Sequence, residues 1–268
     1  MIYIIDGTGP DNFSDYHADM RRGFCWSLKT QNGPAAEYLR GPTELGLETW
    51  EIAELMYSRV KAHPGAPVVL ADTQDNPGVG GNSDTTGLLE ALVRQGARGA
   101  VLGLLVDPAA AAQAHALGPG AVAAFALGAL SGLPGHRPFE GRFVVERLGD
   151  GRLTCTGPMF LGLALELGPM ACLRHEATGV RVVVSTLKFQ AADQALFRHV
   201  GVEPAAQPIL ALKSSVHFRA DFEPIARAVH VVKAPGPALV DPTEFAWKKL
   251  RPGVRLRPMG PVWDGARG

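Results

Sequence analysis

Short apolar runs alternate with helical patterns in the first half of this chain, and this alternation limits the fold more than any other feature. Residues 68–71 and 99–106 are apolar runs of the length of buried strands. Residues 85–95 place leucines on one face of a helix, and residues 107–118 begin with Asp-Pro and end at Gly, as many helices do. Strands that alternate with helices favour a layered α/β fold with some parallel pairing.

The second half adds hairpin signals to this pattern. Two alternating runs flank Gly149-Asp-Gly151 within residues 142–156, which predicts a β-hairpin. Later elements are predicted as a strand pair at 171–174 and 180–185, a helix at 192–199, a strand at 208–213, a helix at 222–229 and a strand at 231–232. The predicted fold class is therefore α/β, with a mixed sheet, flanking helices and additional β-hairpin elements.

Composition excludes several classes of partner. Lys and Arg together number 26, as do Asp and Glu, so the balanced charge gives no reason to expect nucleic acid or an anionic membrane as a partner. The most apolar stretch, residues 99–106, is too short to span a bilayer. Three widely spaced cysteines suit a reducing compartment better than a disulfide framework. These observations predict a cytoplasmic protein that binds neither nucleic acid nor a membrane.

One loop, residues 72–86, joins the end of a predicted buried strand to a helix and carries Asp72, Asp75 and Asp84. Ligands of open α/β sheets favour that edge. A carboxylate cluster on a glycine-containing loop can bind a cation or orient histidines that do so. Alternatively, Asp84 only caps the helix and Asp75 only belongs to a turn. Phosphate binding is disfavoured, because the Walker pattern is absent and three acids would repel it.

A second polar block follows the strand predicted at 208–213. It runs Lys213-Ser-Ser-Val-His-Phe-Arg219. Cationic side chains and free backbone N–H groups at a strand end can form a carboxylate or oxyanion site. His217 can exchange a proton near neutral pH. The alternative is structural, with Ser214 in a turn and Arg219 paired with a surface acid.

Both blocks resemble the C-terminal domain of the MlrC (microcystinase C)-type metallopeptidases. The loop matches the pattern D-x-x-DNPGGG-x-x-GDTT, except that Val79 replaces one glycine. Val202-Glu-Pro204 and the block ending at Arg219 match G-[IV]-x-P followed by KSxxHFR, and residues 250–258 resemble the family's RP-containing ending. The resemblance covers about residues 67–261. It implies an MlrC-type α/β domain at 63–261 and a tail at 262–268, and it leaves residues 1–62 unassigned. Within that segment, apolar residues at helical spacing predict a helix at about 48–61.

The resemblance also implies a function. Members are similar to zinc-dependent peptidases or amidohydrolases acting on small peptides, and their zinc ligands, an Asp-x-His pair and another His, lie in an N-terminal domain much longer than the segment before Val68. Zinc is thus expected for a full-length member and not for this chain alone, so a separate metal-binding domain is a possible partner beside the peptide substrate. Asp15 and His17 have Asp-x-His spacing, but His63 is the next histidine, and surface residues are the favoured interpretation.

The matching positions give the candidate site. His217, Lys213 and Arg219 are predicted to be catalytic, and no metal ligand is predicted. The residues predicted to bind substrate or to support the zinc site from the C-terminal domain are Asp72, Asp75, Asp84, Asn76 and Ser214. Two alternatives to an enzyme stay open, a non-catalytic domain that binds a ligand or partner and an inactive fragment.

Overall fold

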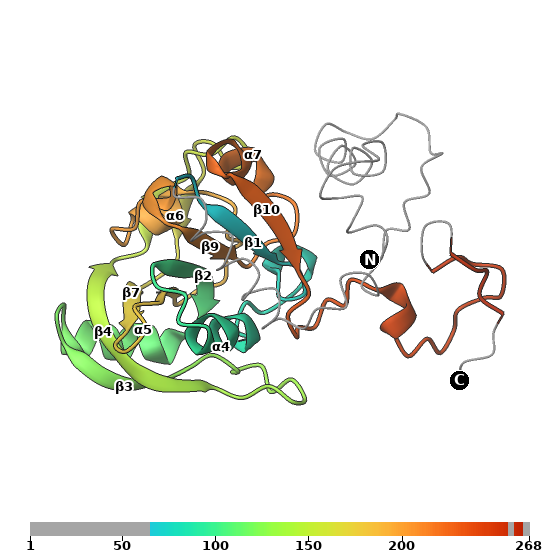
Figure 1. Ribbon diagram of the computed structural model, residues 1–268, viewed down its shortest axis with the longest axis horizontal. Helices are drawn as coiled ribbons and strands as arrows, with labels where there is room; N and C mark the ends of the chain where they lie inside the picture. Colours follow the sequence, from blue (N-terminus) through green and yellow to red (C-terminus); the bar gives the residue numbers. More distant parts are fainter. Residues whose placement is uncertain (1–64, 257–259, 265–268) are drawn as a thin grey trace. The chain divides into compact units, whose positions relative to one another are not determined.

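The computed structural model describes residues 65–256 and 260–264 (Figure 1). The helix predicted at 48–61 and the Asp15/His17 pair lie outside the described residues. Residues 65–238 belong to one compact unit, and the described residues from Leu239 onward belong to another. The second unit contains the short 3-10 helix η4 (Pro242–Glu244). In the described part of the chain, no helix has the length and apolar character that crossing a membrane requires.

An eight-stranded mixed sheet forms the centre of the larger unit. Its parallel part has the spatial order β10 (Ala228–Val232), β1 (Val68–Asp72), β9 (Ile209–Leu212), β2 (Ala100–Val106) and β8 (Arg181–Ser185). Its antiparallel part continues with β7 (Met170–His175), β4 (Phe139–Gly149) and β3 (Val122–Leu127). A separate two-stranded antiparallel sheet consists of β5 (Arg152–Thr154) and β6 (Ala164–Glu166).

Helices cover both faces of the large sheet (Figure 1). On one face, buried residues of α4 (Gly87–Arg94) and α5 (Pro108–Leu117) belong to the same apolar cluster as Val68 and Leu70 of β1. On the other face, buried residues of α6 (Ala195–Arg198) and α7 (Arg219–Phe222) belong to the same apolar cluster as Val69 and Ala71. Strand side chains point alternately to the two faces, so a strand that is buried on both needs an unbroken apolar run. The predicted α/β class, with a mixed sheet and flanking helices, is confirmed.

Local sequence sets several of these elements. The Asp107 side chain accepts a hydrogen bond from Ala110 N at 2.9 Å, and Pro108 follows it, so the predicted start of α5 is confirmed. Gly118, at φ 80°, ends this helix as predicted. The remaining short 3-10 helices are η1 (Pro77–Val79), η2 (Pro204–Ala206) and η3 (Glu223–Ile225).

The hairpin predicted around Gly149-Asp-Gly151 is wrong. β4 pairs with β3 and β7, whereas β5 pairs with β6. The physical reason is tertiary burial, because Phe143 and Val145 of β4 are fully buried in the sheet core and need neighbours on both sides. The strand pair predicted from 171–174 and 180–185 is confirmed as β7 and β8.

The helix predicted at 222–229 is also wrong in its second half. α7 ends at Phe222, η3 follows, and the chain enters β10 at Ala228. Val229 lies in that strand, opposite Val69 of β1. Pro224 is one reason, because proline lacks the N–H that would continue the helix. No sequence pattern predicted β3, and α6 is shorter than the helix predicted at 192–199.

Candidate functional site

A buried lysine organises the polar loop at the carboxyl end of β1. Lys213 directly follows β9, which lies beside β1, and its side chain is fully buried. Its Nζ donates hydrogen bonds to Asp72 Oδ2 at 3.1 Å, Asp75 Oδ2 at 2.7 Å and Thr85 Oγ1 at 3.1 Å. Asp72 and Asp75 thus share one cation in a buried site. We call Asp72, Asp75, Thr85 and Lys213 the buried charge cluster.

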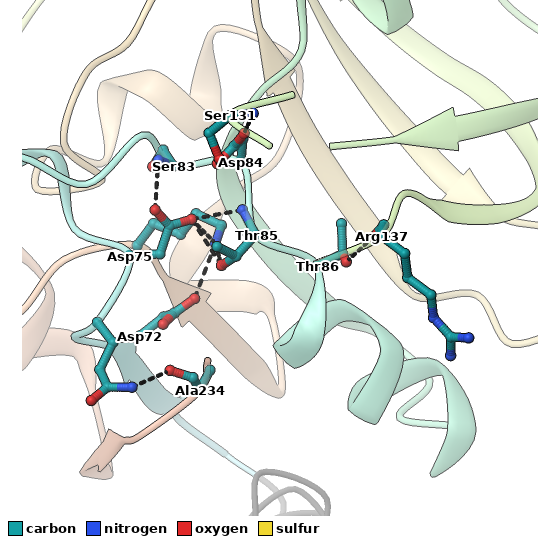
Figure 2. A network of polar contacts seen from close by, with 11 residues as sticks. Asp72, Asp75, Ser83, Asp84, Thr85, Thr86, Ser131, Arg137 and Ala234 are labelled. Atoms are coloured by element: carbon teal, nitrogen blue, oxygen red, sulfur yellow. Dashed lines mark hydrogen bonds and ion pairs between the residues drawn. The ribbon is translucent and has the colours of Figure 1, made fainter. Parts of the chain in front are cut away.

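Asp75 is the most fully bonded member of the buried charge cluster. Its Oδ1 accepts from Ser83 N at 2.8 Å, and its Oδ2 accepts from Thr85 N at 2.8 Å and Thr85 Oγ1 at 2.9 Å (Figure 2). One carboxylate therefore folds the whole loop back onto the end of β1. Thr85, which sequence reasoning did not select, was marked only by its place within the Asp84-Thr-Thr86 motif.

The pKa values of the two aspartates shift in opposite directions from their ordinary value. Burial alone would raise the pKa of Asp75, but Lys213 and Thr85 outweigh burial and hold that pKa below its ordinary value. Burial raises the pKa of Asp72, and Lys213 offsets this only in part. Burial would lower the pKa of Lys213, but the two carboxylates raise it above its ordinary value. Lys213 is accordingly held as a cation at neutral pH.

Asp84 does not join the buried charge cluster. Its carboxylate accepts from Ser131 N at 2.6 Å and from Ser131 Oγ at 3.1 Å (Figure 2). Its carbonyl oxygen accepts from Ala129 N at 2.6 Å. The expectation that three acids converge at the strand end therefore holds for Asp72 and Asp75 alone. Asp84 instead fixes the segment that follows β3.

A second group of hydrogen bonds surrounds His217. Gln190, which follows β8, places its Oε1 2.8 Å from His217 Nδ1 and donates from its Nε2 to Ser214 Oγ at 2.9 Å. Ser214 and Gln190 are buried, and His217 is half-buried. Burial lowers the pKa of His217, so its imidazole is neutral at physiological pH. Gln190 is not among the site residues predicted from the sequence.

Asn76 connects the two loops. Its Oδ1 accepts from Gly78 N at 2.9 Å, and its Nδ2 donates to Ser215 Oγ at 2.7 Å. The side chain is 1% exposed, so in this structure it shapes the turn. Arg219 lies apart from these contacts, paired with Glu223 Oε1 at 3.2 Å and 5.5 Å from the ring centroid of Phe218. Lys213 contacts Asp72 and Asp75, and Arg219 pairs with the half-exposed Glu223, which is the pairing that the structural alternative predicts.

The described residues do not fit a zinc site. Within residues 65–256 and 260–264, no three His, Cys, Asp or Glu side chains are placed to hold a metal ion together. Asp72 and Asp75 already neutralise Lys213, and that cation would repel a second one.

Because the pKa values of Asp75 and Asp72 shift in opposite directions, substitutions at these residues are expected to change stability with opposite pH dependence. Asp75→Asn is expected to lower the free energy of unfolding by about 2 kcal/mol near neutral pH, because a buried hydrogen-bonded charge is lost. Since the folded-state pKa of Asp75 is depressed, its contribution is present above the ordinary value of 3.8 and is lost as pH falls through the folded pKa. Urea denaturation over a pH series should show the gap to wild type narrowing below that value.

Asp72→Asn serves as the matched variant. The folded-state pKa of Asp72 is raised, so the contribution of its carboxyl is complete below the ordinary value of 3.8 and is lost as pH rises through the folded pKa. Relative to wild type, Asp72→Asn should therefore become more stable as pH rises. If the stabilities of the two variants relative to wild type changed with pH in the same direction, the opposite pKa shifts of Asp75 and Asp72 would be contradicted.

The chain is similar to known proteins. The family model described as "MlrC C-terminus" matches residues 70–249. "Microcystinase C" of Sphingomonas sp is 29% identical over 169 residues, which cover 63% of this chain and 32% of that protein. A crystal structure named "Putative metallopeptidase" from Mesorhizobium sp. BNC1 superposes with a TM-score of 0.63 at 24% identity, covering 77% of this chain and 40% of that one.

Each of the two matches to individual proteins covers less than half of that protein's own chain. The chain spans about a third of the Sphingomonas protein and two fifths of the Mesorhizobium chain, so they show the domain and its fold. The family match contains both the Asp72–Thr86 loop and the block from Lys213 to Arg219. This chain belongs to the family of the MlrC C-terminus.

Proposed function

We propose that this chain is the C-terminal part of a cytoplasmic, zinc-dependent metallopeptidase or amidohydrolase that hydrolyses amide bonds in small peptides. Family membership supports the proposal, as does the name of the Sphingomonas relative. The observation that carries it is the placement of His217, Gln190 and Ser214 beside the loops at the carboxyl ends of β8 and β9. Ligands of parallel α/β sheets bind at that edge.

His217 is the residue suited to proton transfer. Amide hydrolysis needs a group that takes a proton from the nucleophile or gives one to the leaving amine. A neutral imidazole with a pKa lowered by burial can accept such a proton near neutral pH. Lys213 is too deeply buried to touch a substrate, so in this proposal it acts by holding Asp72 and Asp75 in place.

The proposal places zinc on residues outside those the structure describes. The buried charge cluster is a poor metal site, and the chain spans 32% of microcystinase C. The partner would then be a metal-binding domain, with Asp75 and Asp84 as loop-forming acids on the side of this chain.

The test uses the purified full chain with and without the remaining N-terminal part of the Sphingomonas relative. Hydrolysis of small linear peptides, including linearised microcystin, is followed by mass spectrometry with added zinc and with a chelator. We expect zinc-dependent cleavage in the mixture, and we expect His217→Gln to lower the rate about 100-fold or more. Lys188→Gln, which changes an exposed residue after β8, is the control and should retain the rate.

Other outcomes separate the alternatives. Peptide binding to the chain by calorimetry, without cleavage in any mixture, would overturn the enzyme proposal and favour a non-catalytic binding domain. Neither binding nor cleavage would overturn both. Stoichiometric zinc in the chain alone would place metal ligands in its residues outside the described ranges.

A further inference from the structure

We infer that Gln190 is a positioning residue that holds neutral His217 in one tautomer, with the proton on Nδ1 and the lone pair on Nε2. The structural part of this inference stands on the contacts of Gln190 alone. Its consequence for catalysis rests on the proposed function. Neither the family match nor the sequence patterns assign a role to this glutamine.

The orientation of the Gln190 amide in this structure specifies the tautomer. Its Nε2 donates to Ser214 Oγ at 2.9 Å, which leaves Oε1 facing His217 Nδ1 at 2.8 Å. An amide oxygen can only accept, so Nδ1 must carry the proton and donate it. In a neutral imidazole the second nitrogen, Nε2, then holds the lone pair. The reverse arrangement would need the amide of Gln190 turned over.

Packing confines the Gln190 amide from several sides. The side chain is 6% exposed, and Ser214 is fully buried. A Cβ built on Gly78 would lie 3.0 Å from Gln190 Oε1 and 3.1 Å from its Nε2, so the loop after β1 closes directly over the amide. Ala191 N donates to Lys213 O at 3.4 Å, which fastens the segment of Gln190 to the end of β9. Loops after β1, β8 and β9 thus hold one amide group.

This arrangement has a chemical consequence. A histidine whose Nδ1–H is bound to a fixed acceptor keeps its ring orientation, and its other nitrogen becomes the atom that takes a proton. Gln190 would act as a neutral counterpart of the carboxylate that orients histidine in many sites. A neutral acceptor fixes the tautomer without the charge that would stabilise the imidazolium, in keeping with a pKa lowered by burial.

The first test reads the tautomer without using activity. The full chain is labelled with ¹⁵N-histidine, and the two-bond ¹H–¹⁵N couplings of His217 are recorded at a pH where the ring is neutral, with His217→Gln to assign the signals. We expect the Nδ1–H pattern in wild type and in Gln190→Glu, whose carboxylate can only accept. Gln190→Met, of similar shape but without an acceptor, should lose the preference.

Gln194→Met is the matched control. Gln194 is a second buried glutamine, 5% exposed, but it bonds Asp221 rather than His217. Its replacement should leave the His217 pattern unchanged even if it lowers stability. An Nε2–H pattern in wild type, or an unchanged pattern in Gln190→Met, would overturn the inference.

The second test concerns catalysis and separates the two proposals. In the hydrolysis mixture, Gln190→Met should lower kcat about 10–100-fold, a range typical of residues that orient a functional histidine, while KM changes little. Gln190→Glu should restore part of this loss. If the tautomer behaves as inferred but no mixture cleaves peptides, the proposed function fails and the positioning role stands. If cleavage occurs and Gln190→Met keeps full kcat, the catalytic consequence is overturned.

Discussion

Replacing Lys213 with methionine is expected to lower the free energy of unfolding by about 3–5 kcal/mol, the usual cost of breaking a buried ion pair from one side. Asp72 and Asp75 would remain in a buried site without their shared cation, at contacts that are now 3.1 Å and 2.7 Å. Asp75 would still accept hydrogen bonds from Ser83 and Thr85, which limits the loss. Urea denaturation near neutral pH measures the change.

Two further variants identify the cause. Lys188→Met removes an exposed lysine and should change stability by no more than about 0.5 kcal/mol. Adding Asp72→Asn and Asp75→Asn to Lys213→Met removes the uncompensated charges and should recover part of the loss. A Lys213→Met loss below about 1 kcal/mol, or no recovery in the triple variant, would contradict the view that pairing of Lys213 with the two carboxylates stabilises this loop.

The sequence predicted those parts of the fold that local signals determine. β1, α4, β2 and α5 follow from apolar runs, a helical leucine face and the Asp107-Pro108 start, all of which act within a few residues. The predicted hairpin is wrong because long-range packing, and not local sequence, decides which strands pair. β4 pairs with two neighbours in the sheet, β3 and β7, and the turn signal at Gly149-Asp-Gly151 does not predict either pairing.

The sequence indicated individual residues of the buried charge cluster but not their arrangement. Sequence patterns selected Asp72, Asp75 and Lys213, yet Lys213 was expected to face a ligand and is instead fully buried between the two acids. Asp72 and Lys213 are 141 positions apart, so no local spacing could pair them. Gln190 has no motif of its own. Its contact with His217 arises because loops after neighbouring strands of the sheet meet at one edge.

Gly128 is a second position where a substitution is expected to destabilise the protein strongly. It lies in the segment after β3 that Asp84 holds through Ala129 and Ser131. Gly128 has a φ of +73°, and its N–H donates to Asp107 Oδ2 at 2.8 Å. A Cβ built there would lie 2.4 Å from Asp84 O and 2.7 Å from Thr86 Cγ2. Gly128→Ala is therefore expected to lower the free energy of unfolding by about 2–4 kcal/mol, from backbone strain and overpacking together. Chemical denaturation of the purified chain measures it.

Gly132→Ala separates those two causes. Gly132 belongs to the same segment and has a φ of +65°, but a Cβ there would meet nothing within 4 Å. It should lose only about 1 kcal/mol, the cost of a left-handed backbone with a side chain. The excess loss in Gly128→Ala then measures the close approach to Asp84, whose carbonyl and carboxylate hold Ala129 and Ser131. Equal losses would mean that the segment moves away freely and that Asp84 does not depend on it for its position.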